Sequence, residues 1–369
     1  MRVIVAPDSF GDTLTAVQAT QVIVDGWRRA RPDDEVIGAP QSDGGPGFVD
    51  VLSSTGGEVR NARVSGPLTR SVDARWLLDP EDAHIGDADA AYIGDAEAAY
   101  IESAQACGLA LLDGPPTRES SLLAHSRGVG ELIAAALEAG ATTIVVGLGG
   151  SCCTDGGRGL VDALGGLVSA RDALRDVELV AATDVEHVLL GPRGAAAVFG
   201  PQKGADSSAV GILEQRNTKW LSELEKAGGT KVSTMPGAGA AGGIGAALFA
   251  LGAVRRSGAD VVAERTGQAE LLKSADLVVT GEGKFDHQSL HGKLVTSVAA
   301  AGALYGVPTL VLAGQAELTE ADYTSFGIVR AESVAAFAGS IEKAMTDARA
   351  NLRGLAERTA RDWNIWRTT

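Results

Sequence analysis

The sequence predicts an α/β protein, in which a doubly wound parallel-sheet, Rossmann-like domain carries a second, inserted α/β domain. Three observations lead to this class. Short, nearly continuous apolar runs rich in β-branched residues recur along the chain, as in parallel strands buried on both faces. Each run stops at glycine, proline or an acidic residue, and helical patterns separate the runs. The length of 369 residues is about twice that of an ordinary domain, which favours two domains.

The expected strands and helices alternate along the chain. The strands are residues 3–6, 36–39, 143–147, 277–280, 309–313 and 328–331. The helices are residues 16–29, 129–139, 290–303 and an amphipathic C-terminal run over 334–361. In such a sheet a ligand binds at the carboxyl ends of the strands, and glycine and aspartate gather after several of these strands.

Two stretches have a different character and are assigned to the inserted domain. Residues 58–80 alternate apolar and polar side chains around Gly66-Pro67, which predicts a hairpin. Residues 177–205 continue with short strands and turns. The first domain is therefore expected over 1–55, 115–165 and 265–369, and the second over 56–114 and 166–264, with boundaries good to about ten residues. A tandem repeat over 85–92 and 93–100 is interpreted as a local duplication.

Composition narrows the function classes. The net charge of −15 and a pI near 4.8 oppose non-specific binding to nucleic acid or to an anionic membrane. The three cysteines, two of them adjacent at Cys152 and Cys153, have neither a disulfide nor a zinc spacing, and they are expected as small buried side chains in a reducing compartment. Without a long apolar run or a leader pattern, a cytoplasmic protein is expected, and a homo-oligomer is compatible with the sequence.

Six loops of the sequence contain candidate site residues. The first and the last of them combine acidic residues with predicted helix starts. Asp8 ends the first strand, and Ser9 or Thr13 is expected to cap the following helix, whose amides favour an anion. Near the other end of the chain, Glu282 and Asp286 bracket a turn. Lys293 follows Gly292 at the start of a helix, and this combination suits Mg²⁺ and phosphate. His287 and His291 have helical spacing but no intervening glutamate, so zinc receives little weight.

The second and third loops are rich in glycine. Asp43 precedes Gly44 and Gly45, a pattern that allows close backbone approach to a ligand but also occurs in ordinary turns. The richest loop covers residues 147–159, and its candidate ligand-binding residues are Gly149, Gly150, Ser151 and Asp155. It matches neither a P-loop, because lysine is absent, nor a dinucleotide fingerprint.

The fourth and fifth loops add a carboxylate, a lysine and further glycines. Asp184 supplies the carboxylate, and Gln202 and Lys203 follow a later turn, where Lys203 could meet phosphate. His187 alone is more often structural than a base. The chargeless run over 236–245 can offer only backbone N–H groups and tight packing, and its candidate residues are Gly239, Gly242 and Gly243.

Taken in order, these six loops resemble the glycerate kinase family, the bacterial type that phosphorylates D-glycerate with ATP. The resemblance covers residues 3 to about 313. The motifs that carry it are, in chain order, Pro-Asp-Ser-Phe at 7–10, Asp-Gly-Gly at 43–45, Gly-Leu-Gly-Gly-Ser at 147–151 with Asp-Gly-Gly at 155–157, Asp-Val at 184–185, Phe-Gly-Pro-Gln-Lys-Gly at 199–204, Gly-Ala-Gly-Ala-Ala-Gly-Gly at 237–243, and Gly-Glu-Gly-Lys-Phe-Asp at 281–286 with Gly-Lys at 292–293. It implies an ATP- and Mg²⁺-dependent kinase that forms a phosphoglycerate, with 2-phosphoglycerate favoured. The site is expected in a cleft between the domains.

Residue roles follow as hypotheses. Lys203 and Lys293 would neutralise phosphate charge, and Glu282 and Asp286 would hold the metal. Asp184 or Asp43 would orient or deprotonate the attacking hydroxyl.

The sequence also departs from the family pattern inside these loops. Gly11 stands where the family commonly has lysine, and Asp12 stands where it has glycine. Pro46, Thr154 and residues 186–188 differ as well. These differences keep open a non-catalytic sensor that binds a hydroxy acid or nucleotide. A dinucleotide-dependent oxidoreductase is a weaker alternative, because Asp172 and Asp176 follow no clear second strand.

Overall fold

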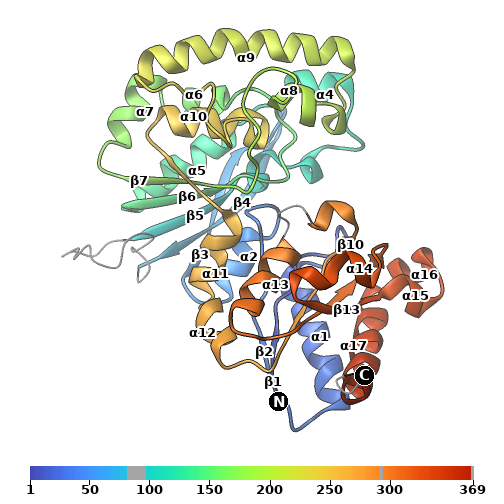
Figure 1. Cartoon of the computed structure of the whole chain (residues 1–369). Helices are drawn as coiled ribbons and strands as arrows, with labels where there is room; N and C mark the ends of the chain where they lie inside the picture. The colour runs from blue at the N-terminus through green and yellow to red at the C-terminus, as the bar shows by residue number, and fades with distance from the viewer. Residues whose placement is uncertain (81–96, 291–293, 367–369) are drawn as a thin grey trace. The chain divides into compact units, whose positions relative to one another are not determined.

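The computed structural model describes residues 1–80, 97–290 and 294–366, with side chains through Trp363 (Figure 1). The chain forms two compact units. Unit 1 contains Met1–Ser42 and Val262–Thr369, and unit 2 contains Asp43–Val261. The second unit is thus one continuous insertion into the first.

Unit 1 is built on a parallel five-stranded sheet with the order β13-β11-β9-β1-β2. Its strands are β1 (Arg2–Val5), β2 (Glu35–Gly38), β9 (Leu277–Thr280), β11 (Thr309–Ala313) and β13 (Ile328–Ser333). The three central strands are almost entirely buried, as their continuous apolar runs predict. The helices are α1 (Ala16–Ala30), α12 (Gln268–Lys273), α13 (Leu294–Leu304), α14 (Glu320–Tyr323), α15 (Val334–Ala338), α16 (Ile341–Thr346) and α17 (Ala348–Trp366). The predicted parallel α/β class is confirmed.

Two details of unit 1 correct the sequence-based expectations. The cap of α1 is Thr15 and not Ser9 or Thr13, because Thr15 and Gln18 form a reciprocal capping box. The C-terminal run is three helices and not one. Gly339 ends α15 in a left-handed conformation with φ of 89°, and Ser340 then caps α16.

Unit 2 contains a six-stranded mixed sheet with the order β3-β4-β5-β6-β7-β8. The strands are β3 (Glu58–Ser65), β4 (Ser71–Asp79), β5 (Ala98–Glu102), β6 (Thr143–Gly147), β7 (Glu178–Ala182) and β8 (Val254–Arg256). The first two form the predicted antiparallel hairpin. The strands from β5 to β8 are parallel to one another.

The division into units differs from the expected boundaries at residues 43–55 and 115–165, which the sequence placed in the first domain and which belong to unit 2. Strand β6 pairs with β5 and β7, so it belongs to the second sheet. A buried apolar strand fits either parallel sheet equally well, and only its hydrogen-bonded partners decide between them. Most of the tandem repeat, residues 85–96, lies outside the described residues.

Helices of unit 2 cover its sheet in layers (Figure 1). They are α2 (Phe48–Ser53), α3 (Ala104–Cys107), α4 (Arg118–Leu123), α5 (Arg127–Glu138), α6 (Arg158–Ala163), α7 (Leu167–Ala173), α8 (Ala195–Phe199), α9 (Ser207–Gly228) and α10 (Ile244–Ala250), while α11 (Gly258–Arg265) spans the unit boundary. Every residue of α10 is buried, because the helix packs on β7 and is covered by α9. Cys107, Cys152 and Cys153 are all buried and free.

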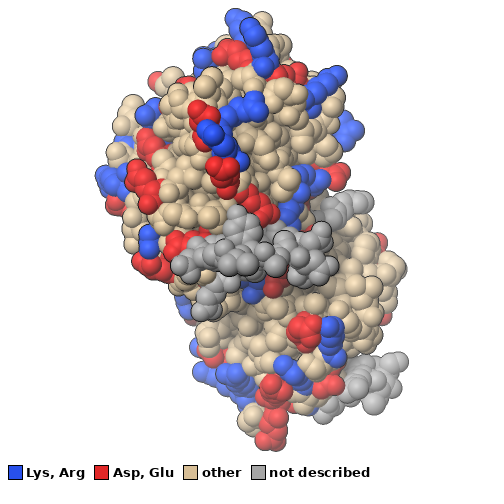
Figure 2. Space-filling model, turned by 90° about the vertical axis from the view of Figure 1, so that its left-hand side faces the viewer, with Lys and Arg blue, Asp and Glu red and all other residues tan. Residues whose placement is uncertain are grey.

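Among the described helices, none combines the length and the apolar character needed to cross a bilayer. Acidic and basic side chains are interspersed over the face shown in Figure 2. Among the described residues that this view draws, lysine and arginine form no continuous stripe.

Candidate active site

The carboxyl edge of the unit 2 sheet carries several of the predicted site residues. The register places Glu102 beside Gly147, and Gly147 beside Ala182, so β5, β6 and β7 end at one level. The glycine loop after β6 and the segment leading to Asp184 after β7 are therefore neighbours. Residues far apart in the sequence meet here because parallel strands end at the same edge.

The loop from Asp43 to Gly45 packs directly on this edge. A Cβ added at Gly149 would lie 2.4 Å from the Cα of Gly45, and one added at Gly44 would lie 2.8 Å from the carbonyl oxygen of Ala182. Gly44 also has φ of 91°, which disfavours a side chain. Glycine at these positions allows the two loops to approach each other closely, so packing alone accounts for part of the pattern.

Asp184 lies close enough to Asp43 for their charges to interact. Its carboxylate accepts hydrogen bonds from the Ser257 side chain and from the Ala259 amide, the latter at 3.3 Å. Burial raises the pKa of Asp184 above its usual value, and the negative charge of Asp43 adds to the rise, while the two hydrogen bonds oppose it. A carboxylate with a raised pKa is better suited to accept a proton from a hydroxyl group.

Lys203 is buried beside the glycine loop. It ends the short 3₁₀ turn over Pro201–Lys203, and its Nζ donates to Ser151 Oγ at 3.0 Å and to the Cys153 carbonyl oxygen at 2.6 Å. Burial lowers the pKa of Lys203. The structure thus brings together Lys203 and Ser151, whereas the neighbouring Gln202 is exposed.

Two predicted ligand-binding groups are instead engaged within the protein. The Asp155 carboxylate accepts from the amides of Ser126, Gly157 and Gly159 and from the Ser126 hydroxyl, at 2.8 to 3.1 Å. It therefore ties together the starts of α5 and α6. The Gly239 amide donates to the His187 carbonyl oxygen at 2.8 Å, so it is not available to a phosphate group.

The remaining glycines of the fifth loop serve close packing. A Cβ at Gly242 would lie 1.9 Å from the Cys153 carbonyl oxygen, and one at Gly243 would lie 2.6 Å from the Cα of Gly156. The fifth loop thus packs against the glycine loop after β6. This close packing explains why the fifth loop has glycine at these positions.

Unit 1 brings together the first and sixth candidate loops. The Asp8 amide donates to the Gly281 carbonyl oxygen at 2.8 Å, and the Asp8 carboxylate accepts from the Ser9 amide at 2.6 Å. Glu282 is buried. Asp286 forms an ion pair of 3.3 Å with Lys284 and accepts from the Gln288 amide at 2.8 Å. Gly292 and Lys293, as well as His291, lie outside the described residues.

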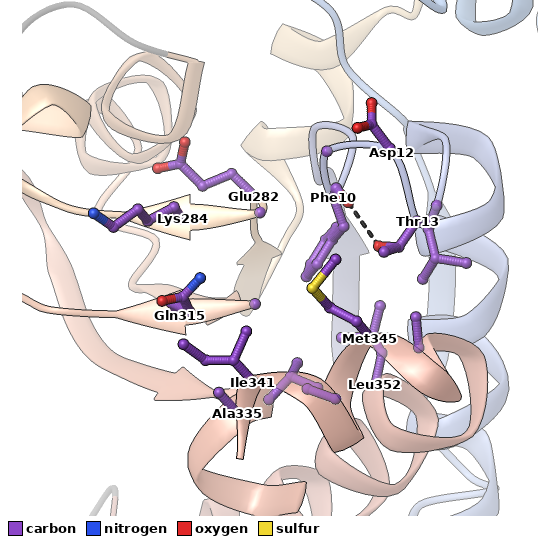
Figure 3. Close-up of a pocket in the computed structure, with 17 residues that line it drawn as sticks. Phe10, Asp12, Thr13, Glu282, Lys284, Gln315, Ala335, Ile341, Met345 and Leu352 are labelled. Carbon is purple, nitrogen blue, oxygen red and sulfur yellow. Dashed lines mark hydrogen bonds between the residues drawn. The ribbon is translucent and has the colours of Figure 1, made fainter. Parts of the chain in front are cut away.

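A hollow of about 460 Å³ opens at this edge of unit 1 (Figure 3). Its walls follow the carboxyl ends of β1, β9, β11 and β13, where a ligand was expected. Apolar side chains of Phe10, Met345 and Leu352 line one side of it, and Glu282 and Lys284 line the other side with their charged ends directed away from these apolar side chains. An apolar cavity with a few polar groups at its rim is the usual form of a small-molecule site.

The described residues contain no cluster of three or more histidine, cysteine, aspartate or glutamate side chains that could hold a metal ion. Mg²⁺ differs from a structural metal in that one or two carboxylates suffice when substrate phosphates supply further oxygens. Glu282 and Asp286 flank the two-residue strand β10 (Lys284–Phe285), and two carboxylates are a donor set compatible with Mg²⁺.

Sequence reasoning missed Glu102, which ends β5 at the same edge. Its Oε2 accepts from the amides of Gly47 at 3.0 Å and Val49 at 3.4 Å, at the start of α2. Burial raises the pKa of Glu102 to about 7. An acidic residue closing an apolar run was the available signal, but the run over 98–102 was not recognised as a strand.

Comparison with known proteins decides the family. The model of the glycerate kinase family matches residues 3–173 and 167–364. The chain belongs to the glycerate kinase family. A glycerate 2-kinase of Escherichia coli K12 is 36% identical to this family member over 380 residues, covering 95% of each chain. An uncharacterized protein of Mycobacterium bovis, Mb2228c, is 56% identical over 360 residues, covering 98% of this chain and 91% of its own.

A solved structure agrees with this assignment. The crystal structure from Salmonella typhimurium LT2, which carries a provisional glycerate kinase 2 assignment, has 32% sequence identity and a TM-score of 0.78, with 100% of both chains covered. This glycerate kinase family member therefore shares the fold of that structure.

The structure shows the contacts of several residues at which this family member departs from the family pattern. Pro46 contacts the glycine loop, since a Cβ at Gly150 would lie 2.5 Å from its Cγ. Gly11 is exposed with φ of 55° on the wall of the unit 1 hollow, and Asp12 lies beside it. His187 packs edge-on against Phe199, and its Nδ1 lies 3.0 Å from the Arg193 carbonyl oxygen. His187 is accordingly structural.

Proposed function

We propose that this protein is an ATP- and Mg²⁺-dependent kinase that phosphorylates D-glycerate, or a close small hydroxy acid, to a phosphoglycerate. The observation that carries the proposal is the pairing of Asp184, with its raised pKa, and Asp43 at the sheet edge of a glycerate kinase family member. The name of the glycerate 2-kinase from Escherichia coli supports 2-phosphoglycerate as the product.

The chemistry asks mainly for positioning and for neutralisation of charge. In the proposed step, Asp184 accepts the proton of the substrate hydroxyl while the hydroxyl oxygen attacks the γ-phosphorus of ATP. The bond from that phosphorus to the bridging oxygen breaks, and ADP leaves. Asp43 orients the hydroxyl group, and its negative charge helps to keep the pKa of Asp184 raised.

Lys203 has two roles in this proposal: it holds the glycine loop in place, and its ammonium group stabilises negative charge. Its contacts to Ser151 Oγ and to the Cys153 carbonyl oxygen hold the loop in place. A buried cation also stabilises negative charge more strongly than an exposed one, because the surroundings have a low dielectric constant. Lys293 is proposed as a second cation for phosphate, on the resemblance alone.

Mg²⁺ would be held by Glu282 and Asp286 together with phosphate oxygens. When bound, it would neutralise charge on the transferring phosphoryl group. We propose that the hollow of unit 1 takes the base and sugar of the nucleotide, since its apolar walls suit a flat ring.

A coupled assay of ADP release with D-glycerate tests the proposal. Wild-type protein should turn over, and EDTA should abolish turnover until Mg²⁺ is restored. The Asp184→Asn variant should lose on the order of 100-fold or more in kcat, as expected for loss of a general base. Asp172→Asn is a matched control, because Asp172 is exposed and pairs only with Arg175 among the described residues.

The same assay separates the kinase from the sensor. A panel of small hydroxy acids is tested for both turnover and binding. Binding of ATP and of a hydroxy acid without ADP release from any member of the panel would overturn the kinase proposal and favour the sensor. Unchanged turnover in Asp184→Asn would instead refute only the role of that residue.

A further inference from the structure

A second hollow, of about 340 Å³, lies within unit 2, and none of its lining residues has a role in the kinase step proposed above. It is enclosed by the end of α4, the start of α6 and the middle of α9. Leu122, Leu213 and Trp220 give it apolar walls, and His125, Arg158 and Arg216 bring polar groups.

Two arginines on this hollow have no acidic partner. The Arg158 guanidinium lies over the Trp220 ring at 5.1 Å from its centre, and Arg216 donates to the Leu122 carbonyl oxygen at 2.7 Å. Among the described residues neither forms an ion pair with a carboxylate. The nearby Arg118 and Arg127 differ in this respect, since they pair with Asp206 and Glu131. In a chain with a net charge of −15, two cations without counter-ions on one hollow form a site suited to an anion.

The one acidic residue on the hollow is already engaged. Asp155 accepts four hydrogen bonds from Ser126, Gly157 and Gly159. These donors stabilise its negative charge within the protein, as backbone amides do for a buried carboxylate. Asp155 therefore does not occupy the two guanidinium groups.

The remaining features add a flat surface and an unused polar atom. The Trp220 ring is fixed, because its Nε1 donates to the Gly156 carbonyl oxygen at 2.9 Å. The Nδ1 of His125 is buried and has no hydrogen-bond partner among the described residues. A buried polar atom without a partner is costly unless a ligand or water satisfies it.

We propose that this hollow binds a small organic anion, with a phosphate or carboxylate group against Arg158 and Arg216 and a flat or apolar body against Trp220. Arginine suits such groups because its planar guanidinium donates two parallel hydrogen bonds to them. The volume corresponds to about ten water molecules, which limits the ligand to a small molecule. The inference stands independently of the proposed kinase activity.

Titration calorimetry in phosphate-free buffer tests it with three probes: phenyl phosphate, benzoate and phenol. Phenyl phosphate should bind most tightly, benzoate more weakly because it carries less charge, and phenol at least tenfold more weakly than phenyl phosphate because it is neutral. The double variant Arg158→Ala/Arg216→Ala should weaken binding of phenyl phosphate at least tenfold. Lys203→Met should leave this binding unchanged, which separates the hollow from the proposed phosphate site.

The matched control is Arg63→Ala/Arg175→Ala, which removes the same charge from two exposed arginines elsewhere in unit 2. It should bind phenyl phosphate as the wild type does. If the double variant of the hollow unfolds, Arg216→Glu alone repeats the test, since Arg216 is exposed on α9. Absence of phenyl phosphate binding to the wild type, or equal affinity in all variants, would overturn the proposal.

Discussion

At the scale of single residues, the sheet edge of unit 2 buries ionisable groups of both signs. Glu102 is 3% exposed and Lys203 is also 3% exposed, yet each contacts backbone polar groups. Burial raises the pKa of Glu102 and lowers that of Lys203, so in both cases the charged form is disfavoured. Such sites are sensitive to pH, because the folded and unfolded states bind protons differently.

Glu102→Gln should stabilise the protein increasingly as the pH rises. In the folded state the pKa of Glu102 is about 7 against 4.5 for an unperturbed group, so the folded state holds this proton more tightly. Stability is therefore lost as the pH rises from 4.5 to about 7. Because the amide does not titrate, the advantage of the variant should grow by about 2 kcal/mol between pH 5.5 and 8.

Urea unfolding at several pH values measures this difference. Glu223→Gln, at an exposed position on α9, is the control. A constant difference between wild type and Glu102→Gln across this range would contradict the raised pKa of Glu102.

Gly242 should tolerate no side chain. A Cβ there would lie 1.9 Å from a backbone oxygen, and φ is 70°. Gly242→Ala should cost more than about 2 kcal/mol, because both the contact and the conformation are unfavourable. Gly211→Ala is the control, since an added Cβ meets nothing within 4 Å on helix α9. It should be neutral or stabilise by about 0.5–1 kcal/mol. Thermal unfolding of both variants checks the contrast.

At the scale of elements, the strands β9 and β11 agree with the local sequence signals, whereas the ends of several helices do not. Strands β9 and β11 have the bounds that their apolar runs predict. The C-terminal run keeps one helical periodicity over 334–361, but Gly339 and Asp347 divide it. Amphipathic spacing indicates which face is buried, whereas caps and left-handed residues decide where each helix ends.

The start of α1 gives a direct test of capping. Thr15→Ala removes the acceptor for the Gln18 amide and should cost about 1 kcal/mol. Thr15→Ser should retain most of the stability, because serine caps as well as threonine. Ser9→Ala, at the position first expected to cap the helix, should have little effect. Chemical unfolding of the three variants measures this, and a larger loss for Ser9→Ala than for Thr15→Ala would contradict the observed capping box.

At the scale of the whole molecule, unit 2 is continuous in sequence and unit 1 is not. The six strands of the second sheet and their hydrophobic core lie within residues 43–261. A unit with its own core can fold alone.

The fragment 43–261 should therefore fold by itself with a cooperative thermal transition. Circular dichroism and amide hydrogen exchange would follow it, and strong protection is expected in β6 and β7. A fragment without cooperative unfolding would show that the core of unit 2 depends on unit 1.

Many residues of the candidate site could be identified from the sequence. The sequence could not show which of them are available to a ligand and which are engaged within the protein. Asp43, Asp184 and Lys203 were identified as chemistry-bearing residues, and the structure brings their loops to one sheet edge. Asp155 and Gly239 looked equivalent to them in the sequence, yet both are engaged in internal hydrogen bonds. Hydrogen-bond partners distant in sequence make this distinction.

The sequence by itself determined the α/β class, the hairpin, the family and the loops that gather at the strand ends. These depend on periodicity and on glycine-rich motifs, which are local properties of the chain. The tertiary structure alone decided which sheet contains β6, which glycines serve close packing, and that Glu102 and the hollow beside Arg158 exist. All of these features depend on contacts between segments that are distant in the chain. The local sequence pattern of a segment does not reveal them, because it is the same whichever other segment it packs against.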